Sequence, residues 1–183
     1  MYNLLLKCAH IWSRLFKQGK QYWGAKAAGM LLVCTDDGTV LLLKRSQEVE
    51  DPGTWGNAGG ALGEGFYSSD DTSEDPPDAD FYQTAVKEAF EELSIVPQSG
   101  QLLAITAFRD GHFTYKTFVY DVSLAEKNRI SKGIRLNWEN DSWEWFGFKN
   151  MPGNLHPGVV FSLGELTKQV PAAPEEAPDE EQS

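Results

Sequence analysis

The chain has 183 residues, 41% of them hydrophobic, which is enough for one domain with a substantial core. Its formal net charge is -11, and the excess acid lies in two stretches. Residues 67–80 hold six carboxylates and the tail after Val170 holds five, with no basic residue in either. The remaining sequence is balanced in charge, which argues against a broad surface for duplex nucleic acid.

The cysteines and the apolar runs indicate the compartment in which the protein is expected to work. Cys8 and Cys34 are too few for a disulfide framework, and no Cys/His spacing suggests zinc. No apolar run approaches the roughly 18 residues of a membrane-spanning helix. Lys7, His10 and Arg14 interrupt the apolar N-terminus, unlike a signal peptide. A soluble, reducing, cytoplasmic setting is therefore expected.

Residues 4–16 have apolar side chains at helical spacing, with basic side chains on another face. The apolar set is Leu5, Cys8, Ala9, Trp12, Leu15 and Phe16. The pattern predicts a helix that docks on the domain. Contact with a membrane surface or a partner is the alternative.

Two strands joined by a hairpin are predicted next. Residues 27–34 have a strand pattern, residues 36–38 read Asp-Asp-Gly, and residues 39–44 form a second strand that is apolar enough to be buried on both faces. Arg45 ends this strand, where its guanidinium can pair with a substrate phosphate. An ordinary surface salt bridge is an equal alternative for Arg45.

Residues 46–58 are expected to form a loop that leads to a glycine turn. Four glycines, Gly59, Gly60, Gly63 and Gly65, permit close approach of the backbone to a ligand. A tight turn without a ligand is the alternative interpretation. Trp55, within the loop, is expected to pack in the core.

Residues 80–93 are predicted to form an amphipathic helix, because apolar residues recur there at helical spacing. On this helix Glu88, Glu91 and Glu92 stand at i, i+3 and i+4 and share one patch, and Lys87 lies four residues before Glu91. A bound Mg²⁺ or Mn²⁺ would remove the repulsion between such carboxylates. A solvated acidic face is the alternative.

The last third of the chain is predicted to supply three strands and a helix. Residues 102–109 and 115–122 form strands, residues 126–135 form a loop, a last strand lies within residues 137–146, and residues 159–168 form a short helix after His156, which orders that turn. The Pro-, Ala- and Glu-rich tail, residues 171–183, is expected to be disordered.

Residues 87–95 resemble the second half of the box of the Nudix hydrolases, with Lys87 in place of arginine and Ser94 in place of glycine. Residues 52–60 resemble the approach to that box and residues 41–45 resemble the strand before it. The similarity extends from about residue 27 to residue 165. The first glutamate of the box would fall on Phe66, and an insertion of about 15 residues follows the nearest carboxylate, Glu64.

This resemblance implies an α/β fold, specifically an α/β/α sandwich with a mixed sheet. The expected organisation is an N-terminal helix and linker over residues 1–24, a hydrolase domain over residues 25–170 with an acidic insertion at about residues 67–80, and the acidic tail over residues 171–183. The implied reaction is hydrolysis of a diphosphate linkage in a nucleoside diphosphate derivative, with Mg²⁺ or Mn²⁺ as the cofactor. A Nudix-like module that binds a nucleotide or a partner without hydrolysis is the alternative, and a homodimer is possible.

The resemblance also implies roles for individual residues. The expected catalytic residues are Glu91, Glu92, Glu139 and Lys87. The expected metal site is made by Glu88, Glu91, Glu92, Glu64 and Gly60. The expected substrate contacts are Arg45, Gly59 and Gly60. Glu144 is a second candidate for the general base, and Asp70 or Asp71 is an alternative to Glu64 as the substitute for the glutamate that Phe66 replaces.

Overall fold

The computed structural model describes residues 26–62, 78–111 and 113–169. Several expectations concern residues outside these ranges. They are the helix in residues 4–16, the roles of Glu64, Phe66, Asp70 and Asp71, most of the acidic insertion, and the tail over residues 171–183. In the part of the chain that the structure describes, no helix is both long and apolar enough to cross a membrane.

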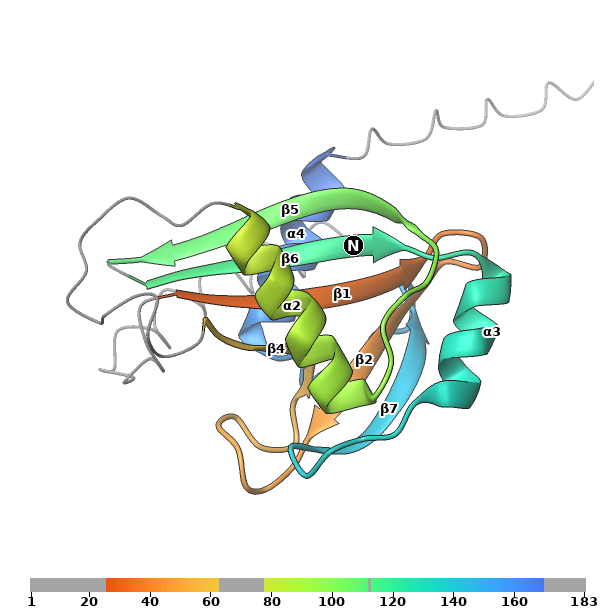
Figure 1. The fold of residues 1–183 in the computed structure, drawn as a ribbon, viewed down its shortest axis with the longest axis horizontal. Helices are drawn as coiled ribbons and strands as arrows, with labels where there is room; N and C mark the ends of the chain where they lie inside the picture. The colour runs from red at the N-terminus through yellow and green to blue at the C-terminus, as the bar shows by residue number, and fades with distance from the viewer. Residues whose placement is uncertain (1–25, 63–77, 112, 170–183) are drawn as a thin grey trace, which may run out of the picture.

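A seven-stranded mixed sheet forms the middle layer (Figure 1). Its strands are β1 (Lys26–Cys34), β2 (Thr39–Arg45), β3 (Trp55–Gly56), β4 (Ala58–Ala61), β5 (Gln101–Asp110), β6 (Phe113–Asp121) and β7 (Asn140–Gly147). The order is β3-β2-β1-β6-β5, with β4 paired to β1 and β7 paired to β2. β1 and β6 are parallel, and the other pairs are antiparallel.

The β1 strand changes partner along its length. Its first half, from Ala27 to Met30, pairs with β4, whereas Val33 and Cys34 pair with β2. The β2 and β4 strands therefore separate beside the middle of β1, and this position proves to be where the glutamates of the long helix reach the sheet.

Helices cover both faces of the sheet. α2 (Asp78–Leu93) packs over Ala28, Met30 and Leu32 of β1, and α3 (Leu124–Gly133) adds Ile130 to the same core cluster. On the other face, α4 (Pro157–Gln169) packs over Leu31 and Val33. Every residue of β1 is buried, as a strand between two helical layers requires. The α/β/α sandwich with a mixed sheet is thus confirmed.

Most predicted elements are present, with bounds shifted by one or two residues. Three predictions are wrong. Residues 55–56 lie in β3 rather than in a loop, because they pair with Leu43 and Lys44 of β2. Gly59 and Gly60 lie in β4 rather than in a turn, because the backbone of residues 58–61 pairs with β1. Residues 126–135 are largely helical rather than a loop, because Ser123 caps α3 by accepting from the Glu126 N–H at 3.3 Å, and Ile130 buries its apolar side chain in the core.

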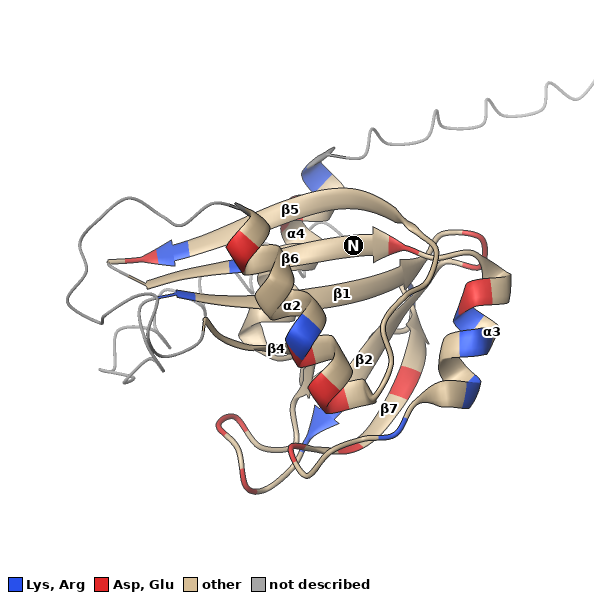
Figure 2. Ribbon diagram, viewed as in Figure 1, with Lys and Arg blue, Asp and Glu red and all other residues tan. Residues whose placement is uncertain are grey.

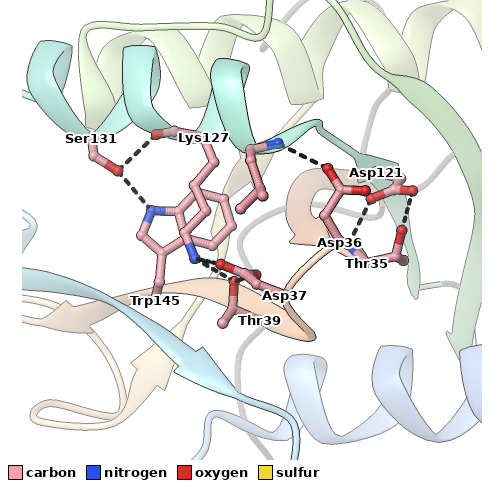
Figure 3. Close-up of polar contacts among 9 residues, drawn as sticks. Thr35, Asp36, Asp37, Thr39, Asp121, Lys127, Ser131 and Trp145 are labelled. Atoms are coloured by element: carbon pink, nitrogen blue, oxygen red, sulfur yellow. Dashed lines mark hydrogen bonds and ion pairs between the residues drawn. The ribbon is translucent and has the colours of Figure 1, made fainter.

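Polar contacts attach α3 to the β1–β2 hairpin (Figure 3). Lys127 Nζ bonds the Asp37 carboxylate and, at 2.8 Å, Thr39 Oγ1, and it lies 4.8 Å from the ring centroid of Trp145. The Asp36 carboxylate accepts from the Leu124 N–H at 3.0 Å. The helix is therefore fixed over the hairpin, and the chain that leaves it runs through residues 134–139 toward the glutamates of α2.

Candidate active site

Glu92 of α2 is hydrogen-bonded to two strands, β4 and β7. Its side chain is only 4% exposed. The Gly59 N–H of β4 donates to Glu92 Oε1 at 2.6 Å, and Asn140 Nδ2 of β7 donates to Glu92 Oε2 at 2.7 Å. Both carboxylate oxygens of Glu92 therefore have a donor, as a buried carboxylate requires.

The pKa of Glu92 is raised to about 7, mainly by burial and to a smaller extent by the charges of Glu139 and Glu88, while the Gly59 and Asn140 donors oppose the shift. The same two causes, burial first and then nearby carboxylates, raise the pKa of Glu88, with Lys87 opposing. These carboxylates are held in an environment that disfavours their negative charge. A cation placed beside them would favour the charged forms.

Glu88 lies directly against the backbone of β4. A Cβ atom added to Gly60 would come within 2.6 Å of Glu88 Oε2, a distance that real Cβ atoms do not show. Glycine at position 60 is therefore what allows the carboxylate to reach the strand, in agreement with the close approach that glycine permits.

Lys87 bridges two of the glutamates. Its Nζ lies 3.3 Å from Glu88 Oε1 and 2.9 Å from Glu91 Oε2, and the ion pair with Glu91 is the one predicted from the i, i+4 spacing. Figure 2 shows one basic band on α2, followed by acidic bands toward the C-terminal end of the helix. The hydrogen bond to Glu91 is the main cause that raises the pKa of Lys87. Glu91 is the exposed member of the set, with half of its side chain accessible.

Two more predicted site residues lie at the end of β2 and just before β7. Arg45 pairs with Asn140 across the β2–β7 ladder, and its Nε donates to the Glu50 carbonyl at 2.7 Å. The Glu139 carbonyl accepts from the Ser46 N–H at 2.8 Å, and the charge of Glu139 raises the pKa of both Glu88 and Glu92. Glu139 is therefore within electrostatic range of both carboxylates. Glu144, the other candidate base, is exposed on β7.

Tyr115 fills the space behind Gly59. Its hydroxyl would lie 2.3 Å from a Cβ on Gly59 and 2.2 Å from a Cβ on Gly29, and Asn57 Nδ2 lies 3.3 Å from it. Burial raises the pKa of Tyr115 to about 12, so the hydroxyl keeps its proton. Gly59 thus serves close packing of β1 and β4 over Tyr115, and it contributes its N–H to Glu92.

A model of the NUDIX domain matches residues 24–169. The chain belongs to the Nudix family. Comparison with curated proteins found no match. The Nudix relationship extends over the whole α/β/α sandwich and both halves of the site described above.

Solved structures agree with this assignment. The Nudix hydrolase RenU from M. smegmatis is 25% identical, with a TM-score of 0.53, and the match covers 86% of this chain and 94% of RenU. The MutT protein from Methanosarcina mazei Go1 is 16% identical, with a TM-score of 0.53, and the match covers 82% of this chain and 98% of the MutT protein. DR0079 from Deinococcus radiodurans is 19% identical, with a TM-score of 0.51, and the match covers 83% of this chain and 86% of DR0079.

The three glutamates of the Nudix helix have different surroundings. Glu92 is buried and accepts two hydrogen bonds, Glu88 lies against Gly60, and Glu91 faces solvent beside Lys87. Within the described ranges, no three His, Cys, Asp or Glu side chains converge as a metal site. The carboxylates of Glu88 and Glu91 both contact one cation, the Lys87 ammonium. Carboxylate oxygen is the type of ligand that Mg²⁺ and Mn²⁺ prefer. The oxygen atoms of Glu88 and Glu91 are therefore of the kind that a divalent ion takes.

Asn140, Asn57 and Tyr115 are the site residues that the sequence did not indicate. Asn140 and Tyr115 lie 48 residues after Glu92 and 58 residues after Asn57, their respective partners. No spacing along one helix or strand links residues so far apart. Only the strand order of the sheet brings them together.

Proposed function

We propose that this Nudix protein hydrolyses a diphosphate linkage in a nucleoside diphosphate derivative, with Mg²⁺ or Mn²⁺ as its cofactor. One observation carries the proposal. The Glu88 carboxylate lies against Gly60, and the buried Glu92 is held beside it by Gly59 and Asn140. The long helix and the glycine strand thus form one polar site in a NUDIX domain, which is similar to the Nudix hydrolase RenU.

The residues of the chain divide the work. Glu88 and Glu91 hold the divalent ion, with Glu64 as a proposed third ligand outside the described residues. When bound, the ion neutralises the diphosphate and lowers the pKa of a water molecule. Glu92 fixes α2 against β4 and β7, and its charge adds to the attraction for the cation.

Substrate binding and proton transfer fall to residues outside α2. We propose Glu139 as the general base, because its charge is felt by both Glu88 and Glu92. Arg45 binds a phosphate with its guanidinium, which suits that geometry. Gly60 leaves room at the strand for the carboxylate of Glu88.

The test is a screen of dinucleotides, nucleotide sugars and nucleoside triphosphates with Mg²⁺ and with Mn²⁺, followed by variants on the best substrate. Glu91→Gln should lower kcat/KM at least a hundredfold while the unfolding midpoint stays within the error of the wild type. Glu139→Gln should lower kcat more than it changes KM. Glu165→Gln, on α4 at the opposite face of the sheet, is the control and should leave turnover unchanged. Wild-type turnover in Glu91→Gln would refute the proposed ligand.

A binding module without hydrolysis is the second candidate. It is favoured by Phe66, which stands where the family box has its first glutamate, and by Lys87 and Ser94 in place of the arginine and glycine of the box. Calorimetry separates the two functions. Saturable nucleotide binding, with no phosphate or monophosphate released in Mg²⁺ or Mn²⁺ over hours, would support the module and exclude the enzyme.

The cytoplasmic setting and a homodimer stay predictions. Cys34 is a free and buried thiol. Sedimentation of the full chain at several concentrations would measure the oligomeric state.

A further inference from the structure

Exposed apolar side chains lie on α2 and on the edge strand β5. They are Tyr82 and Phe90 of α2, which are 38% and 60% exposed, and Leu102 and Ile105 of β5, which are 41% and 36% exposed. Tyr82 and Phe90 stand eight residues apart, with the half-buried Val86 midway, so they form one stripe along the helix. We call these four residues the α2–β5 surface.

The sheet register shows that the two parts face the same side. Ile105 pairs with Phe118, and Leu102 pairs with Tyr120. The Tyr82 ring packs on both β6 partners, with centroid distances of 5.4 Å to Phe118 and 6.2 Å to Tyr120. Tyr82 of α2 therefore borders directly on the part of β6 that lies beside Leu102 and Ile105.

The other face of β5 is covered, because Thr106 bonds Ser162 of α4 at 3.0 Å and Ala104 packs in the core beneath α4. In Figure 1, β5 forms the edge of the sheet and α2 crosses the face in front of it. The α2–β5 surface also lies on the side of α2 opposite Glu88, since positions 82, 86 and 90 are turned by about half a revolution from position 88. Whatever covers this surface leaves the glutamate site open.

The 25 residues before β1 supply a segment of matching chemistry. Residues 4–16 have an apolar face at helical spacing, which includes Cys8 and Trp12, whereas residues 63–77 and 170–183 are rich in acid and proline. β1 begins at Lys26, and Met30 of β1 pairs with Phe118, the partner of Ile105. Ile105 is thus about 13 Å along and about 10 Å across the sheet from the start of β1. The nine residues 17–25 can span up to about 30 Å.

We propose that residues 4–16 form a helix whose apolar face packs on the α2–β5 surface of the same chain. Cys8 then lies next to β5, with Lys7, His10 and Arg14 toward solvent. The edge of the sheet is covered by the chain itself, which is one way that proteins protect edge strands. A second copy of the chain is the competing occupant.

Disulfide trapping in the full-length chain tests this arrangement. Ile105→Cys places a thiol on the surface, and diamide accepts the two electrons and two protons that leave when the Cys8 thiol bonds the introduced thiol. Cys34 is fully buried and does not compete. The matched control is Asn128→Cys, an exposed position on α3. A disulfide from Cys8 to position 105 within one chain, identified by peptide mass, should form at least ten times faster in Ile105→Cys than a disulfide from Cys8 to position 128 forms in the control.

Equal rates for the two variants would overturn the proposal. A dimer linked through the thiol at position 105 would also overturn it, because a second copy would then occupy the surface. A second measurement uses no oxidant. Phe90→Ser and Trp12→Ser should each lower Tm, and the double variant should lower Tm no further than the larger single effect. Additive losses would contradict contact between the two segments.

Discussion

Asn140 donates its side-chain amide to Glu92 at 2.7 Å, across the boundary between the last strand and the Nudix helix. The Gly59 N–H holds the other oxygen of the same carboxylate. Glu92 would otherwise be a buried carboxylate with an oxygen lacking a donor, which costs about 1–3 kcal/mol. The contact thus fixes the side of α2 that carries Glu88 and Glu91.

We expect Asn140→Ala to lower the free energy of unfolding by about 1–3 kcal/mol, since it leaves Glu92 Oε2 buried without that donor. Activity should fall about 10- to 100-fold, as is usual when a group that orients a site carboxylate is removed. Urea denaturation and kcat/KM measure the two effects. Asp141→Ala, an exposed neighbour, is the control. Wild-type stability and activity in Asn140→Ala would show that the contact is dispensable.

The two glycines of β4 should respond differently to alanine. In Gly60→Ala the new Cβ meets the flexible end of Glu88 at 2.6 Å, so the carboxylate moves and the fold survives. In Gly59→Ala it meets the Ala28 carbonyl at 2.8 Å and Gly29 Cα at 2.9 Å, backbone atoms that cannot move as easily. We expect at least a tenfold loss of activity with little loss of stability for Gly60→Ala, and a loss of about 1–3 kcal/mol for Gly59→Ala.

Gly153→Ala provides the control for both glycine variants, because no atom of the described residues lies within 4 Å of its added Cβ. Thermal unfolding and kcat/KM at saturating Mg²⁺ separate the two outcomes. If Gly60→Ala unfolded as readily as Gly59→Ala, the Glu88 carboxylate would be too firmly held to move aside, and the expected difference between the two glycines would be wrong.

The sequence predicted the helix of the site better than its surroundings. Helical spacing placed Glu88, Glu91 and Lys87 together because periodicity is a local property. The burial of Glu92 away from Glu91 was not predictable, since it depends on hydrogen bonds from Gly59 and Asn140, which are 33 and 48 residues away. α3 was missed because its surface is polar and only Ile130 and Ile134 anchor it in the core. Tertiary packing decided both cases.

Lys87 should affect orientation more than stability. The Lys87 side chain is 62% exposed and its ion pair with Glu91 lies at the surface, so Lys87→Met should cost no more than about 1 kcal/mol of unfolding free energy. Loss of the ammonium leaves two repelling carboxylates, and we expect kcat/KM to fall about tenfold. Lys87→Arg, in contrast to Lys87→Met, should keep the activity of the wild type, because a guanidinium binds both carboxylates in a fixed geometry.

The ion pair of Lys168 with Glu165 on α4 offers a matched control for Lys87, and Lys168→Met should not change turnover. Equal turnover in Lys87→Met and the wild type would argue that Glu91 needs no partner to keep its place.

Acid sensitivity should come from Glu126, a buried residue at the start of α3. Its carboxylate accepts from Arg129 Nη2 at 2.7 Å and from the Gln98 N–H at 2.6 Å, and the Arg129 hydrogen bond is the main cause that lowers its pKa from 4.5 to about 2. Because the folded state binds the proton more weakly than the unfolded chain, this stabilisation is complete above about pH 4.5 and is lost as the pH falls toward 2.

We therefore expect the wild-type protein to lose about 2 kcal/mol of unfolding free energy between pH 4.5 and pH 2 through this group, in addition to the losses from other carboxylates. Glu126→Gln should be less stable at pH 7. Its loss of unfolding free energy between pH 4.5 and pH 2, measured by urea denaturation at each pH, should be smaller by that amount. Glu165→Gln, which removes an exposed ion pair, should leave this loss nearly unchanged. Parallel pH curves for Glu126→Gln and the wild type would mean that Arg129 and Gln98 do not hold the charged carboxylate in solution.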